Sequence, residues 1–253
     1  MSTLTIAAAQ SLSIAGDLCG NIVRHGRFIE KAAEQGVELL VFPELSLTGY
    51  EGEVAAALAI EPHDAVLQPL RDLARELGVT AVVGMPIWLE DRASVLIGAL
   101  VLGADGSLGV YSKQHLHSGE DLVFTPGLGG PTLTIGGEVV ALAVCADFSH
   151  ASHAAAAAGR GAGLYAAGVL ISEKGYPADT SVLQSYARQH SMAVLMANHG
   201  GQTGGWQSAG RSGIWSEDGS LIVAAAGAGD LLVVAQRNDG AWQGRVVPVA
   251  HIQ

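Results

Sequence analysis

The chain has 253 residues, of which 49% are hydrophobic and 15% are charged, with a formal net charge of −11. This acidic balance disfavours nucleic acid as a partner because phosphates would be repelled. Gly, Asp, Lys or His interrupts every apolar run before it reaches the length of a membrane span, so we expect no membrane partner. Residues 1–10 lack the basic start of a signal peptide, and two cysteines make no disulfide scaffold, so we expect a reducing cytoplasm.

The first half of the chain alternates predicted strands and helices. We expect strands at residues 4–10, 37–42, 80–84, 94–102 and 108–111, helices at 17–35 and 66–77, and a short helix or turn at 54–60. The helix at 66–77 has Leu67, Leu70 and Leu73 on one side, and Gly78 follows it. Residues 104–107 predict a hairpin turn. Strands that alternate with helices and are then followed by hairpins indicate a mixed sheet rather than a wholly parallel one.

The second half predicts a similar mixture of strands and helices. We expect a loop at residues 122–131, strands at 132–135, 139–144, 169–171, 193–197, 212–215, 221–225 and 231–235, and helices at 151–158 and 180–190. No Pro/Ser-rich linker, charge run or internal repeat divides the chain, which predicts one domain over residues 1–253. The tail at 242–253 has no clear partner in the pattern, so we expect it to embrace a second subunit.

Three apolar strands end in residues that carry chemistry. The run at 139–144 leads into Cys145, at the turn into an alanine-rich helix whose amides would favour a thiolate. Taken alone, Cys145 could equally be a small buried hydrophobe. The run at 37–42 leads to Glu44, and the run at 108–111 leads to Lys113. A base, a cation and a nucleophile together suffice for thiol acyl transfer.

These segments resemble the signature motifs of the nitrilase, or carbon–nitrogen hydrolase, superfamily. Residues 42–50, FPELSLTGY, resemble its glutamate motif. Residues 111–116, YSKQHL, followed by Glu120 and by FTPG at 124–127, resemble its lysine motif and second glutamate. Residues 145–147, CAD, have the Cys-x-Asp form of its nucleophile motif. Three ordered motifs are a far more specific signal than any one of them.

The resemblance spans nearly the whole chain, from the strand at 6–10 to residues 210–212 and beyond. It implies an α/β fold, a four-layer αββα sandwich of two mixed β-sheets with helices on the outer faces. It also implies a single carbon–nitrogen hydrolase domain that needs no metal or organic cofactor. With the high apolar content, it leads us to expect a homodimer or a higher homo-oligomer.

The resemblance, together with the chemistry of these groups, predicts hydrolysis of a small amide through a thioester. Lys113 as an ammonium would favour the Cys145 thiolate, because an unperturbed thiol has a pKa of about 8.5. Glu44 would take the thiol proton, return it to the leaving amine and then activate water. Lys113 and the Ala146 backbone N–H would stabilise the oxyanion. Glu120 would orient Lys113 or polarise the water, or else form a surface salt bridge.

Four residues are candidate substrate contacts: Tyr50, Ala146, His150 and Glu173. Tyr50 closes the glutamate motif, and it either lines the pocket or packs in the core. His150 follows the nucleophile closely enough to face the pocket. Glu173 either selects a cationic or amino-bearing substrate or pairs with Lys174 in solvent. The spacing of the histidines does not match a zinc site, so we expect no metal.

Three alternatives to an amide hydrolase remain open. True nitrilases of this superfamily commonly carry Trp where this chain has Ala146, which disfavours a nitrile substrate. An N-carbamoyl amino acid would need a cation for its carboxylate, and Arg160, Arg188 and Arg211 are candidates. A catalytically silent binding or assembly module is the alternative from another class of protein. The presence of all three reactive groups counts against that module.

Overall fold

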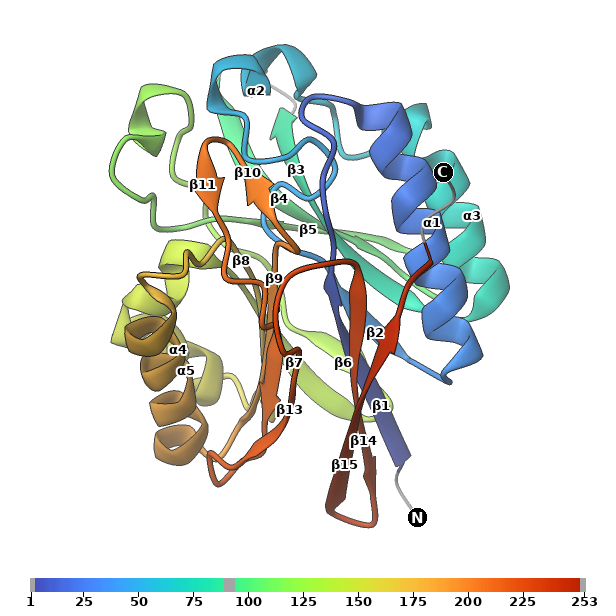
Figure 1. Ribbon diagram of the computed structural model, residues 1–253, viewed down its shortest axis with the longest axis vertical. Helices are drawn as coiled ribbons and strands as arrows, with labels where there is room; N and C mark the ends of the chain where they lie inside the picture. The colour runs from blue at the N-terminus through green and yellow to red at the C-terminus, as the bar shows by residue number, and fades with distance from the viewer. Residues whose placement is uncertain (1–2, 89–93, 251–253) are drawn as a thin grey trace.

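A computed structural model describes residues 3–88 and 94–250 of the protein (Figure 1). Its strands form two large mixed sheets that pack face to face, and helices cover both outer faces (Figure 1). This arrangement confirms the predicted four-layer αββα sandwich. Along the described chain, no helix is both long enough and apolar enough to cross a membrane.

The first sheet has the strand order β15-β14-β1-β2-β3-β4-β5 in the described residues. Its strands are β1 (Thr3–Gln10), β2 (Leu39–Val41), β3 (Thr80–Trp88), β4 (Val95–Leu102), β5 (Leu108–Ser112), β14 (Leu231–Asn238) and β15 (Ala241–Pro248). Strands β1, β2 and β3 are parallel, whereas β4 is antiparallel to both β3 and β5. Strands β2 and β5 therefore run in the same direction and end at the same edge of the sheet.

The second sheet has the order β13-β12-β9-β8-β7-β6. Its strands are β6 (Leu133–Ile135), β7 (Glu138–Val144), β8 (Leu164–Val169), β9 (Ala193–Asn198), β12 (Gly213–Trp215) and β13 (Leu221–Ala224). The three central strands, β7, β8 and β9, are parallel. Functional groups in open α/β sheets gather outside the carboxyl ends of parallel strands, so the end of β7 is the expected place for a nucleophile.

Two helices cover each outer face of the sandwich. Helices α1 (Leu18–Glu34) and α3 (Gln68–Leu77) lie on the first sheet, and α4 (Ala151–Gly159) and α5 (Tyr176–His190) lie on the second (Figure 1). The smaller elements are α2 (Gly52–Leu58), a hairpin of β10 (Gln202–Thr203) and β11 (Trp206–Gln207), and the 3-10 helices η1 (Ala65–Leu67), η2 (Glu120–Leu122) and η3 (Cys145–Ser149). In Figure 1 the β10–β11 hairpin lies above the second sheet, beyond the ends of its parallel strands.

The side chains of each strand point alternately to its two faces, and together they form three apolar layers. On β7, Leu142 faces the layer between the two sheets, whereas Ala141 and Ala143 face helices α4 and α5. On β1, Ile6 faces the same central layer and Ala7 faces α1 and α3. Side chains of a strand point alternately to its two faces, so each strand contributes to two layers. Small residues beneath the helices allow those helices to approach the sheets closely.

Two glycines let the backbone after β2 lie between the sheets. A Cβ on Gly84 of β3 would lie 2.4 Å from the carbonyl oxygen of Pro43, and one on Gly168 of β8 would lie 2.5 Å from that of Phe42. Real Cβ atoms do not approach so closely, so only glycine fits at either position. The segment that carries Glu44 therefore lies against β3 of the first sheet on one side and against β8 of the second sheet on the other.

The strand predicted at 169–171 is wrong, because β8 spans Leu164–Val169. Its sequence, LYAAGV, contains one β-branched residue, so it lacks the composition that identifies a strand. Helix α5 begins at Tyr176 rather than at residue 180, because Pro177 lies in its first turn, where proline is tolerated.

Residues 242–248 of the predicted tail pair within their own chain, contrary to the expectation that the tail had no partner there, and residues 251–253 lie outside the described residues. Strand β15 is antiparallel to β14 along its length. Leu231 is opposite Pro248 at one end, and Asn238 is opposite Ala241 at the other. Asp239 and Gly240 have φ values of 48° and 85° at the hairpin turn. Asp-Gly favours such a turn because both central residues need positive φ. A subunit contact by this segment stays a prediction.

We expect Gly168→Ala to lower the free energy of unfolding by about 1–3 kcal/mol, because the new methyl group would press on the Phe42 carbonyl. Gly159→Ala is the matched control, since no atom lies within 4 Å of a Cβ at that helical position. Urea unfolding of both variants would measure the difference. Equal stability of the two variants would contradict the proposed close approach.

Candidate active site

Three strand ends bring the predicted reactive groups together. Glu44 follows β2, Lys113 follows β5 and Cys145 follows β7. Strands β2 and β5 end at one edge of the first sheet, and β7 ends facing them from the second sheet. Lys113 Nζ lies 2.6 Å from Glu44 Oε1, and both Glu44 and Cys145 line one cavity. Residues from three distant segments therefore form one site between the two sheets.

Lys113 is fully buried and binds two carboxylates. Its Nζ donates to Glu44 Oε1 at 2.6 Å and to Glu120 Oε1 and Oε2 at 2.7 and 2.8 Å. Glu120 also accepts from the Tyr50 hydroxyl at 2.6 Å and from the His117 backbone N–H at 2.7 Å. These contacts account for all three ammonium donors. Glu120 is 6% exposed, so it is not part of a surface salt bridge.

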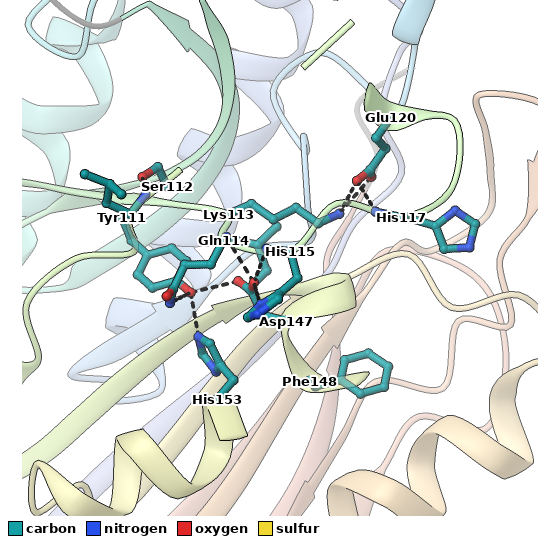
Figure 2. A network of polar contacts seen from close by, with 12 residues as sticks. Tyr111, Ser112, Lys113, Gln114, His115, His117, Glu120, Asp147, Phe148 and His153 are labelled. Carbon is teal, nitrogen blue, oxygen red and sulfur yellow. Dashed lines mark hydrogen bonds and ion pairs between the residues drawn. The ribbon is translucent and has the colours of Figure 1, made fainter. Parts of the chain in front are cut away.

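Asp147 joins the lysine segment to the nucleophile turn, as Figure 2 shows. Its Oδ1 accepts from the backbone N–H groups of Gln114 and His115 at 3.0 and 2.9 Å. Its Oδ2 accepts from the Val144 backbone N–H at 3.0 Å and from the Tyr111 hydroxyl at 2.7 Å. One fully buried carboxylate thus fixes Lys113 relative to Cys145, which lies two residues before Asp147.

Two residues of the site have strained backbones. Cys145 has a φ of 42° at the turn from β7 into η3, and Leu45, directly after Glu44, has a φ of 51°. Positive φ is unfavourable for residues with a Cβ and persists only where the surroundings impose it. At Cys145 the strained turn ends β7 abruptly, which leaves the thiol in the cavity wall.

The glutamate segment is held by two buried histidines. His25 Nε2 lies 2.9 Å from Ser46 Oγ, and its ring stacks on Phe42 with centroids 4.1 Å apart. His199 Nε2 lies 2.7 Å from the carbonyl oxygen of Glu44, so this nitrogen must carry the proton and donate. Burial lowers the pKa of His25 to about 3 and that of His199 to about 4, so both rings are neutral.

Burial sets the charge states of the site. It raises the pKa of Glu44 to about 7, although the Lys113 ammonium opposes it. It also raises the pKa of the Cys145 thiol above its usual range, and the Glu44 carboxylate adds to this effect. Burial alone would lower the pKa of Lys113, but the negative charges around it, chiefly Glu44, raise it overall. These shifts favour a neutral thiol and a charged ammonium in the resting site, although the charge of Lys113 opposes the rise in the pKa of the thiol.

A cavity of about 280 Å³ opens beside the thiol. Its wall contains Glu44, Tyr50, His117, Cys145, Ala146, Phe148, Ser149, Leu170, Ile171, Ser172, Gly175, Asp179 and Trp206. Glu44 Oε2 is buried and has no hydrogen-bond partner among the described residues. This oxygen is therefore available to a proton of the thiol or of a bound molecule. The volume suits a small molecule rather than a peptide chain.

The predicted substrate contacts divide into two groups. Tyr50 and Ala146 lie in the cavity wall, and Tyr50 also packs against the core between the sheets. His150 is not among the lining residues, and its ring stacks on that of His115 with centroids 3.8 Å apart. Glu173 is also absent from the lining, and it pairs at 3.1 Å with Arg211 rather than with Lys174. The geometry gives no support to a substrate contact by His150 or Glu173.

Several residues of the site had no predicted role. His199 follows the carboxyl end of β9, and Ile171 lies two residues beyond that of β8. The strand-end argument that identified Cys145 applies equally to these positions, so the signal was present. Asp179 on α5 and Trp206 on β11 reach the cavity from elements whose positions depend on packing, and no spacing in the sequence identified them.

Comparison with known proteins identifies the family. The sequence matches the carbon–nitrogen hydrolase family over residues 5–243. It is 34% identical over 152 residues to a nitrilase of Pyrococcus abyssi, which covers 58% of this chain and 57% of that protein. It is 28% identical over 216 residues to an (R)-stereoselective amidase of Pseudomonas sp., which covers 82% of this chain and 73% of that protein.

A solved structure shows the same fold over almost the entire chain. A double mutant of the amidase from Nesterenkonia sp. AN1, in complex with acrylamide, matches with a TM-score of 0.86 and 27% identity. The match covers 94% of this chain and 92% of that amidase. This protein belongs to the carbon–nitrogen hydrolase family, which confirms the resemblance seen in the three motifs.

We expect Asp147→Ala to lower the free energy of unfolding by roughly 3 kcal/mol or more, because it leaves several buried N–H groups unpaired. Asp105→Ala is the matched control, since Asp105 is an exposed turn residue that accepts from Ser107 N–H at 2.9 Å. That control should cause only a small loss. If urea unfolding gave similar losses for both variants, the cross-link by Asp147 would not be important for stability.

Proposed function

We propose that this protein is an amidase that hydrolyses a small linear amide to a carboxylic acid and ammonia through a thioester on Cys145. The observation that carries the proposal is the cavity that Cys145 and Glu44 line together, in which Glu44 Oε2 is buried and has no hydrogen-bond partner among the described residues. A thiol with a raised pKa needs a base, and a carboxyl with a pKa near 7 is suited to that role at neutral pH.

In the first half of the reaction, Cys145 Sγ attacks the amide carbonyl carbon while Glu44 takes the thiol proton. The carbon–sulfur bond forms, and the carbonyl electron pair moves to the oxygen. The Ala146 backbone N–H and the charge of Lys113 stabilise this oxyanion. The intermediate collapses, the carbon–nitrogen bond breaks, and the nitrogen leaves as ammonia with the proton from Glu44. A thioester remains on Cys145.

In the second half, water attacks the thioester carbonyl while Glu44 accepts a proton from the water. Collapse of this intermediate breaks the carbon–sulfur bond and releases the carboxylic acid, and the thiol regains its proton from Glu44. Lys113 keeps Glu44 in position through both halves, because its ammonium bonds to Glu44 Oε1 and leaves Oε2 free. Glu120 holds Lys113 from the other side.

The structural neighbours support a small amide as substrate. Mutants of the Nesterenkonia amidase were solved in complex with acrylamide and with butyramide. In another mutant, the acetamide moiety of fluoroacetamide is covalently added to the active-site cysteine. Relatives named nitrilase and cyanide hydratase keep nitrile chemistry as a second candidate, since the same thiol can attack a nitrile carbon.

An N-carbamoyl amino acid fits the cavity less well. None of the described residues that line it is Arg or Lys, so no strong cation would meet the carboxylate. Arg211, one of the predicted candidates, pairs with Glu173 instead. A catalytically silent module is disfavoured because the three reactive groups are together and buried. The homodimer or larger assembly and the cytoplasmic location stay predictions from the sequence.

The pH dependence of activity should follow Glu44. Because Glu44 must be ionised to accept the thiol proton, kcat/KM should fall about tenfold per pH unit below an apparent pKa of about 7 and level off above it. Lys113 stays charged across this range, so it causes no loss of activity on the alkaline side. A pH profile for one neutral amide would test this. A rate that is flat from about pH 5 to 8 would contradict Glu44 as the base.

The proposed function is tested by intact-protein mass spectrometry with an assay for released ammonia. Wild type would be mixed with acetamide, butyramide, butyronitrile and N-carbamoyl-alanine. We expect ammonia from the amides and a transient acyl adduct, and we expect neither with Cys145→Ala. Glu44→Gln should lower kcat by about 10²- to 10⁴-fold because the general base is lost.

Cys19→Ala is the matched control for the thiol, because Cys19 is exposed in α1 and absent from the cavity wall. This variant should keep full activity and form the same adduct. A folded, reduced wild type that releases no ammonia from any compound would overturn the amidase proposal. Ammonia from the nitrile alone would favour the second candidate.

A further inference from the structure

The cavity contains an acidic side chain that the proposed reaction does not use. Asp179 lies in the first turn of α5 and lines the cavity together with Cys145. Its carboxylate forms no hydrogen bond or ion pair in the part of the chain that the structure describes, whereas its backbone N–H donates to the Gly175 carbonyl at 3.0 Å. The turn thus fixes the residue but leaves its charge free to meet a ligand.

The charges around Asp179 make the cavity negative. Glu44 provides a second carboxylate in the wall, and its Oε2 is unpaired. Lys113 is already bonded to Glu44 and to Glu120, so the buried cluster has two carboxylates for one ammonium. His117 is the wall residue that partly opposes the effect of burial on the pKa of Asp179. No Arg or Lys is among the described lining residues.

An aromatic ring and apolar side chains complete the wall. Trp206 packs edge-on against His117, with ring centroids 6.2 Å apart at 88°. Phe148 and Leu170 lie in the same wall and suit an aliphatic chain. An aromatic face can also attract an ammonium group. The cavity therefore offers a nucleophile, an apolar surface and a free carboxylate to one small molecule.

We propose that the substrate is an amide carrying an ammonium group on its aliphatic chain, with Asp179 as the counter-ion that selects it. This substrate class rests on the amidase function proposed above. The carbonyl carbon would lie at Cys145, the chain against the apolar wall and the ammonium at Asp179. A chain ending in a carboxylate would be repelled by the carboxylate of Asp179 and would be disfavoured. Charge selection was one of two roles considered for Glu173, the other being a pair with Lys174, but the structure pairs that residue with Arg211 outside the cavity wall.

The test compares amides of matched shape and different charge. Valeramide replaces the ammonium of γ-aminobutyramide with a methyl group, and succinamic acid replaces its terminal aminomethyl group with a carboxylate. A second pair, δ-aminovaleramide and caproamide, covers a chain longer by one methylene. We expect wild type to prefer each ammonium amide over its neutral partner by at least about tenfold in kcat/KM, and to act least on succinamic acid.

Asp179→Asn should remove that preference, because the ammonium amides should lose at least about tenfold in kcat/KM relative to their neutral partners. The matched control is Glu173→Gln, which neutralises a nearby carboxylate outside the cavity wall and should leave the preference intact. If the preference survives Asp179→Asn, or wild type shows none while hydrolysing valeramide, the inference is overturned and the amidase function stands. An equal loss for charged and neutral amides would mean that Asp179 only stabilises α5, which also overturns the inference.

If wild type hydrolyses none of the amides, ligand binding to the Cys145→Ala variant still distinguishes the two proposals. Calorimetry would compare γ-aminobutyramide, valeramide and succinamic acid in this variant and in the Cys145→Ala, Asp179→Asn double variant. If wild type hydrolyses no amide but Cys145→Ala binds the ammonium compound selectively through Asp179, the amidase function fails and the ligand class is supported. Equal binding of all three compounds would overturn the ligand class.

Discussion

The site depends on one buried ammonium between two carboxylates. Lys113 has no exposed surface, and its contacts to Glu44 and Glu120 satisfy all of its donors. Removing one partner of a buried ion pair typically costs about 3–5 kcal/mol, because the remaining charge is left uncompensated. The three residues therefore hold one another in place. Because Lys113 bonds to Glu44 Oε1, Oε2 is the oxygen left without a partner among the described residues.

Three features of the backbone bring this cluster to Cys145. Parallel strands of the two sheets end at the same side of the sandwich, so the glutamate, lysine and cysteine segments meet there. Gly84 and Gly168 allow the glutamate segment to lie against both sheets. Asp147 bonds the lysine segment to the end of β7. These contacts also maintain the positive φ of Cys145, which is unfavourable in isolation.

The sequence predicted the parts of the site that strand ends determine. Glu44, Lys113 and Cys145 each follow an apolar run with strand character, so their proximity could be inferred. The four-layer fold came from the resemblance to the superfamily, because the pattern alone indicates only a mixed α/β fold. Strand β8 was misplaced because alanine and glycine give no strand signal, although burial between β7 and β9 stabilises it. The cavity wall could not be predicted, because whether Asp179 or Glu173 faces the thiol depends on how α5 packs, not on sequence spacing.

The excess negative charge of Glu44 and Glu120 over Lys113 has two consequences, one for the thiol and one for the ligand. It raises the pKa of Cys145, so the thiol stays neutral until Glu44 removes its proton. It also disfavours anionic molecules in the cavity and favours cationic ones, because Lys113 neutralises only one of its two carboxylate partners. A site that stored a thiolate would need additional positive charge near the sulfur. That charge would attract anions, so in this cavity the use of a neutral thiol and the preference for a cation follow from one arrangement of charges.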